Sequence, residues 1–159
     1  MAYIYPAPGS AGDVAITITT NSGTDSTGLV LAAVQDVTIN NANDVFTWQQ
    51  LDSGSKLQIA TTATNSISMN IVLDQNTFFG VTTVGEDAQT AGIFGLSKDK
   101  TKIDFEIYLG DKSDDQSGSS GKTLSGEGYI TGLAPTVSAQ SPVWVSPITI
   151  TVDGDYAVS

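Results

Sequence analysis

The sequence predicts a mainly β domain, sandwich-like or barrel-like, with one short helix. Apolar residues alternate with polar ones along several segments, these segments are rich in β-branched residues, and clusters of Gly, Asn, Asp and Ser separate them. The 159 residues correspond to about one domain of usual size. We therefore expect a single domain over residues 1–159, beginning with an N-terminal segment 1–12.

The first predicted strand has Val14, Ile16 and Ile18 on one face. A long strand is then predicted for 29–39, followed by a turn at 40–44. Shorter strands are predicted for 45–48, 57–62 and 66–73. In the last of these, one face carries Ile67, Met69, Ile71 and Leu73, and the other carries Ser66, Ser68 and Asn70.

The only predicted helix covers about 86–96, because acidic residues stand in its first turn and Gly95 near its end. The clearest strand is 101–109, with Ile103, Phe105, Ile107 and Leu109 on one face. A Gly- and Ser-rich acidic segment, 111–121, is predicted to be a flexible loop. Two final strands are predicted for 128–133 and 143–152, and Pro147 places the last one at an edge or a bulge.

The residue types that are absent exclude several functions. The chain has no His and no Cys, which excludes Ser-His-Asp and Cys-His nucleophiles, imidazole or thiolate metal sites, and disulfides. It has six Lys and no Arg against 17 acidic residues, so no basic patch for duplex recognition is expected. We expect no enzyme activity, no cofactor, no membrane segment and no signal peptide.

Three groups of residues are candidates for chemistry. Asp111, Asp114 and Asp115 carry oxygen ligands for Ca²⁺, but the EF-hand order is missing, so a solvated loop is the favoured interpretation. Asp104 and Glu106 resemble a glycosidase pair only superficially, because they share one face of one strand. Trp48 and Trp144 could stack on sugars or bases, but a core or interface role is favoured.

Two regions of the sequence resemble the major tail tube proteins of bacteriophages. The segment 121–133, GKTLSGEGYITGL, followed by PITITVDGD at 147–155, is similar to the closing strands of that family. The segment 46–56, FTWQQLDSGSK, is similar to the loop and strand that precede the tube-forming strands. With the predicted helix, the resemblance covers most of residues 30–156.

The resemblance implies a structural virion protein made in the host cytoplasm, with the tail tube fold. Subunits of this family form rings, expected here to be hexamers, that stack head to tail into a hollow tube. Viral DNA passes through the tube without specific binding during genome ejection. The implied partners are other copies of the chain and other tail proteins, such as the tape measure, terminator and distal tail proteins.

Short neutral polar side chains suit the wall of a DNA channel because they offer phosphates no positive charge. On this basis the residues expected to face the lumen are Gln58, Thr62, Ser66, Ser68 and Asn70. Asp111, Asp114 and Asp115 are expected on an inter-ring or surface loop. The alternative function is a capsid decoration protein or a surface carbohydrate-binding β domain.

Overall fold

The computed structural model describes residues 14–20, 28–31, 34–51, 54–81, 88–109 and 122–159. The N-terminal segment 1–12 and the acidic loop 111–121, with Asp111, Asp114 and Asp115, therefore lie outside the described residues. The described part is mostly strand, as the sequence predicts. The strands are β1 (Val14–Thr20), β2 (Leu29–Leu31), β3 (Val34–Gln49), β4 (Lys56–Val72), β5 (Ile103–Leu109), β6 (Lys122–Leu133), β7 (Thr136–Ser138), β8 (Ser141–Val152) and β9 (Ala157–Val158).

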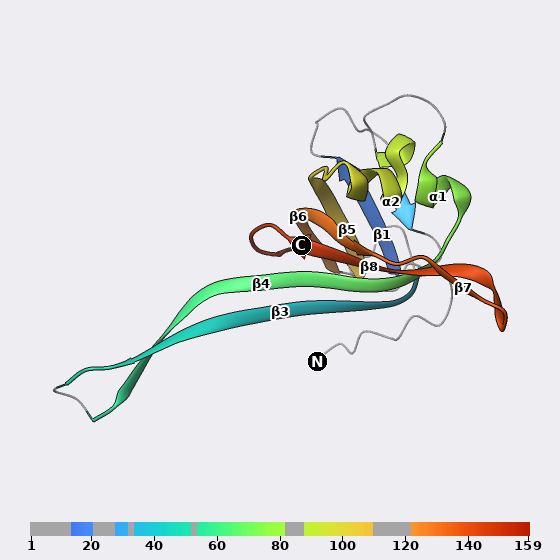
Figure 1. The fold of residues 1–159 in the computed structure, drawn as a ribbon. Coiled ribbons are helices and arrows are strands. Elements are labelled where there is room, and N and C mark those ends of the chain that lie inside the picture. The colour runs from blue at the N-terminus through green and yellow to red at the C-terminus, as the bar shows by residue number, and fades with distance from the viewer. Residues whose placement is uncertain (1–13, 21–27, 32–33, 52–53, 82–87, 110–121) are drawn as a thin grey trace, which may run out of the picture.

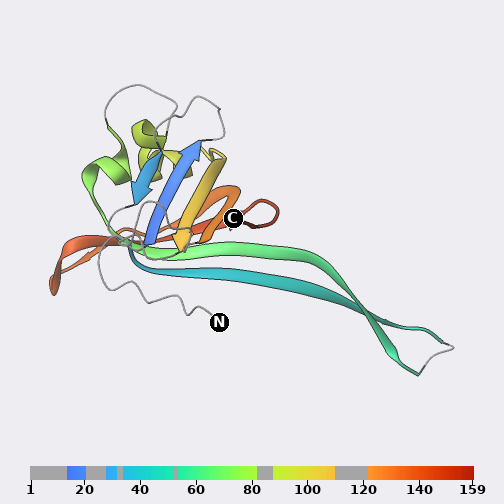
Figure 2. The ribbon, with the colours of Figure 1, turned by 180° about the vertical axis from the view of Figure 1, so that it is seen from behind.

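These strands form one antiparallel sheet in the order β2-β1-β5-β6-β8-β4-β3, with β7 paired to β8 and β9 to β6. The sheet bends, so that β1 and β5 run across the direction of β3 and β4 (Figures 1 and 2). Its two edge strands come together at one corner, because three residue steps from Leu31 to Val34 span at most about 11 Å. The described strands thus form one curled sheet, whereas a sandwich is built from two.

The core lies inside this curl and follows the alternation in the sequence. Ile16 and Ile18 of β1, Ile103 and Ile107 of β5, and Ile67 of β4 are all 0% exposed. Burial of these side chains is the main favourable term in folding. The other fully or almost fully buried apolar residues include Met69, Ile71, Phe105, Ile148 and Ile150.

Two helices lie together at one end of the curled sheet (Figure 1). The helix predicted for 86–96 is observed as α2 (Ala88–Lys98), which packs on β1, β2 and β6 and buries Ile93 and Leu96. It is kinked at Gly92, whose φ of 63° and ψ of 175° are not helical. The prediction of a single helix was wrong, because Asp74 caps a second, five-residue helix, α1 (Gln75–Phe79).

Further local predictions were wrong because the pairing of strands, and not the local sequence alone, sets where each strand begins, ends and lies in the sheet. The strand predicted for 29–39 is divided between β2 and β3, which are at opposite edges of the sheet order. The turn predicted at 40–44 lies within β3, and the strands predicted for 57–62 and 66–73 are one strand, β4. The edge position predicted for the last strand was wrong, because β8 lies between β6 and β4 in the sheet order. Pro147 is paired with Asn70 of β4, at the point where the neighbour on the other side of β8 changes from β6 to β7.

Candidate assembly surfaces

The longest feature of the molecule is a hairpin that extends beyond its body. β3 and β4 pair from Gln49 opposite Lys56 to Val34 opposite Ile71, and the hairpin leaves the curled sheet as a twisted ribbon (Figures 1 and 2). Every side chain that the structure describes between Asn41 and Thr61 is exposed. We call residues 41–61 the arm. The arm has no core of its own, because a two-stranded ribbon cannot bury both of its faces.

One face of the arm is apolar and aromatic. Phe46 is paired with Ile59, and Trp48 with Leu57, so these four side chains share a face. Their exposed fractions are 59% for Phe46, 55% for Ile59, 36% for Trp48 and 37% for Leu57. The rings of Phe46 and Trp48 stack with centroids 6.0 Å apart. An exposed apolar patch of this kind marks an interaction site.

A β-bulge in β4 reverses the alternation of its side chains between the arm and the part of the hairpin that belongs to the curled sheet. Pairing shifts between Asn43 and Val45, so that two residues of β4 stand opposite Asp44, and the Thr61 hydroxyl donates to the Asp44 carbonyl over 3.1 Å. The face with Ser66 and Ser68 therefore continues along the arm into Leu57 and Ile59. Gln58 is on the reverse face, opposite Thr47.

At the base of the hairpin, the same face is neutral and polar. Ser66 is paired with Thr151 of β8, and Ser68 with Thr149. The hydroxyls of Thr131 on β6 and Thr151 lie 2.9 Å apart, which extends the polar surface to a fourth strand. We call this surface the polar strip; it consists of Thr38, Asn40, Ser66, Ser68, Thr131, Thr149 and Thr151.

The five residues predicted to face a lumen are thus divided by the structure. Ser66 and Ser68 lie on the polar strip, and Asn70 lies at its end, where its amide donates to Asp36 over 2.9 and 3.0 Å. Gln58 is on the reverse face, and Thr62 is in β4 next to the bulge, but its side chain is outside what the structure describes. The alternation of residues 147–152 is enough to predict that Thr149 and Thr151 share a polar face. That Thr131 belongs to the same surface follows only from the pairing of β6 with β8.

Tyr156 fixes the base of the arm. Its hydroxyl lies 2.9 Å from the carbonyl oxygen of Asn40 and 3.0 Å from that of Ser66, and burial raises its pKa. The buried Asn65 amide donates to Gly154 and to Asp155, each over 3.2 Å. The segment after β8 therefore holds β3 and β4 at the point where the arm begins.

A groove lies beside α1. It has a volume of about 500 Å³ and is lined by Leu73, Asp74, Gln75, Phe78, Phe79, Pro135 and Trp144. Trp144 is 52% exposed and Phe79 is 63% exposed. Phe78, Phe79 and Phe94 contact one another with ring centroids 4.9 to 5.9 Å apart. Both tryptophans of the chain are therefore on exposed apolar surfaces and not in the core.

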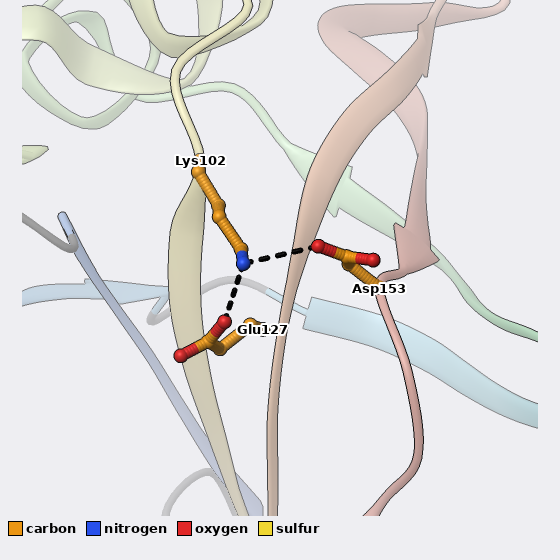
Figure 3. A network of polar contacts seen from close by, with 3 residues as sticks. All are labelled: Lys102, Glu127 and Asp153. Carbon is orange, nitrogen blue, oxygen red and sulfur yellow. Dashed lines mark ion pairs between the residues drawn. The ribbon is translucent and has the colours of Figure 1, made fainter.

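The acidic residues of β5 belong to an exposed charged face. Lys102 forms ion pairs with Glu127 over 2.5 Å and with Asp153 over 3.0 Å, and the hydrogen bonds to these two residues raise its pKa (Figure 3). The pKa of Asp104 is raised mainly by partial burial of its carboxyl group, and the nearby Glu127 carboxylate raises it further. Asp104 is paired with Thr19 and Glu127, and Glu106 with Thr17 and Ser125, so the two carboxylates do not flank a cleft.

Two further features concern only the described part of the chain. Within it, no helix is both long and apolar enough to span a bilayer. Nor does it contain three or more acidic residues grouped so that they could bind a metal ion.

Comparison with known proteins gives matches in structure only. No protein-family model matches the chain, and no curated protein matches it. A chain from the virion of a native gene transfer agent particle is similar, with a TM-score of 0.62 and 13% identity, over 94% of this chain and 98% of that one.

Two other tail assemblies contain similar chains. The match to the SPP1 tail tube has a TM-score of 0.64 and 12% identity, over 92% of this chain and 77% of that one. A chain of the anti-feeding prophage baseplate matches with a TM-score of 0.59 and 9% identity, over 97% of each chain. The curled antiparallel sheet of this chain, together with α1 and α2, thus has the fold of the phage tail tube proteins.

Proposed function

We propose that this chain is a structural, non-enzymatic subunit of a phage-type tail tube in the virion. Six copies form a ring, rings stack head to tail, and viral DNA passes through the resulting tube without specific binding. Two observations together support this proposal. The chain has the tail tube fold, and the apolar face of its arm is exposed in the single subunit. Two of the similar assemblies, the gene transfer agent tail and the anti-feeding prophage baseplate, are described with sixfold symmetry.

Sheet edges and charge support the same function. β3 forms one edge of the sheet order, and a neighbouring copy in a closed ring could pair with an edge of this kind. The chain carries a net charge of −11, so an assembled wall would repel the phosphates of DNA. Tape measure, terminator and distal tail proteins would contact the ends and the inside of such a tube.

The proposal is tested by electron microscopy of the concentrated full-length chain. We expect annular particles or hollow filaments that persist with EDTA and with nuclease. The chain has no His, Cys or Arg, its described residues contain no group of acidic side chains that could bind a metal ion, and its net charge of −11 disfavours phosphate binding. Particles that remain globular at every concentration would favour the decoration-protein alternative, and assembly that disappears with EDTA or nuclease would contradict the proposal.

The polar strip is proposed to line the lumen. A double variant, Ser66→Lys with Ser68→Lys, should form normal tubes that retain a short labelled DNA duplex, since lysines attract the phosphate backbone. DNA held in the lumen should be protected from nuclease and released by salt.

The matched control adds two lysines in the turn between β7 and β8, Ala139→Lys with Gln140→Lys. DNA bound through this turn should remain sensitive to nuclease. Equal nuclease sensitivity of DNA on both variants would show that the polar strip does not face the lumen.

A further inference from the structure

The arm and the groove beside α1 are at opposite ends of the molecule. In both views the arm leaves the body on the side away from α1 and β7 (Figures 1 and 2). The arm of one copy therefore cannot fill its own groove. A contact between these two surfaces has to join two copies, and because the surfaces differ, the contact is head-to-tail and leaves one of each free.

The two surfaces match in chemistry. The apolar face of the arm ends in Trp48 and Leu57, and the groove has Phe79 and Trp144 on its exposed walls. Contacts dominated by buried aromatic side chains supply most of the energy in protein interfaces. A hollow of about 500 Å³ is within the ~300–1,000 Å³ range of sites that enclose a drug-sized ligand, so it can accept large side chains from the end of the arm.

The charges at the two surfaces also match. Lys56 immediately precedes Leu57 and is exposed at the end of the arm, while Asp74 is at the rim of the groove. Asp74 already accepts hydrogen bonds from the backbone NH and the hydroxyl of Thr77, and a carboxylate has further lone pairs for a lysine. In a chain of net charge −11, copies repel one another, so an opposite-charge pair selects this orientation.

We propose that the groove formed by Leu73, Phe78, Phe79, Pro135 and Trp144 is the receptor for the arm of a second copy. Trp48 and Leu57 enter the groove, and Lys56 pairs with Asp74 at its rim. This inference rests on the proposed self-assembly and adds to it the site at which one copy holds the next.

Cross-linking tests the contact directly, because the chain has no Cys of its own. One double variant carries Ser55→Cys at the end of the arm and Gln75→Cys on the groove wall, which leaves the aromatic and charged residues in place. With a short bismaleimide, we expect a ladder of covalent multimers. Each single variant should give dimers at most, since it has one thiol, and adding Trp48→Ser to the double variant should abolish the ladder.

The matched control pairs Ser55→Cys with Glu106→Cys, an exposed position on β5. A ladder with Gln75→Cys and none with Glu106→Cys supports the groove as the receptor. If rings or tubes are seen in the microscope but a ladder forms with Glu106→Cys, or with neither pair, the groove is not the receptor for the arm. The proposed function would still be supported in that case. Absence of both particles and ladder would contradict the two together.

Discussion

Replacing Phe46 and Trp48 with serine is expected to leave a folded subunit that no longer assembles. The two side chains are 59% and 36% exposed and contribute little to the core, so the body should keep its stability. In an interface, truncation of an aromatic anchor costs about 2–4 kcal/mol. At about 1.4 kcal/mol per factor of ten, that weakens each contact at least roughly thirty-fold.

Sedimentation velocity measures this loss of assembly, and circular dichroism shows whether the subunit stays folded. The matched control changes the reverse face of the same strand, Thr47→Ser with Gln49→Ser, and should assemble normally. Tubes formed equally well by the Phe46 and Trp48 variant would show that the apolar face of the arm has no part in assembly.

Substitution of Gly92 by alanine is expected to destabilise the chain strongly. Gly92 has a φ of 63°, which L side chains rarely adopt, and its Cβ would be placed against the backbone of Gly80 and Phe78. Glycine is needed there because α1 and α2 approach through their backbones. The strain and the displaced packing together should lower the free energy of unfolding by about 3 kcal/mol or more.

Urea unfolding of the monomeric chain measures this effect, and Gly95→Ala in the same helix is its control. A Cβ at Gly95 would lie 3.2 Å from the Cβ of Ala91 alone, and alanine favours a helix by up to about 1 kcal/mol over glycine. Gly95→Ala should therefore be close to neutral. If the two variants unfold at the same urea concentration, the backbone contact at Gly92 is not important for stability.

Local sequence patterns are sufficient to identify many of the buried residues. The alternation in 103–107 and in 67–71 places isoleucine, phenylalanine and methionine on one face, and these side chains are buried at 0 to 2% exposure. The same alternation placed Ser66 and Ser68 on the opposite face, in what is now the polar strip. The helix near 86–96 followed from its acidic start and its glycine, although Gly92 kinks it.

Gln58 illustrates what alternation alone could not give. The sequence groups Gln58 with Ser66 and Ser68, because each is a polar residue in a strand pattern. The bulge opposite Asp44 adds one residue to β4, which moves Gln58 to the reverse face and brings Leu57 and Ile59 into line with the polar strip. The sequence around the bulge contains no signal for it, since Thr and Ala occur on both sides.

The amino-acid sequence alone establishes the β class, the faces of the central strands, the position of α2 and the residue types that the chain lacks. These depend on the period of a strand and on composition, which are local properties. Tertiary structure decided the length of the arm, the face of Gln58 and the groove between α1, Pro135 and Trp144. Each of these depends on pairing and packing between residues far apart in the chain, where long-range contacts outweigh local turn preferences.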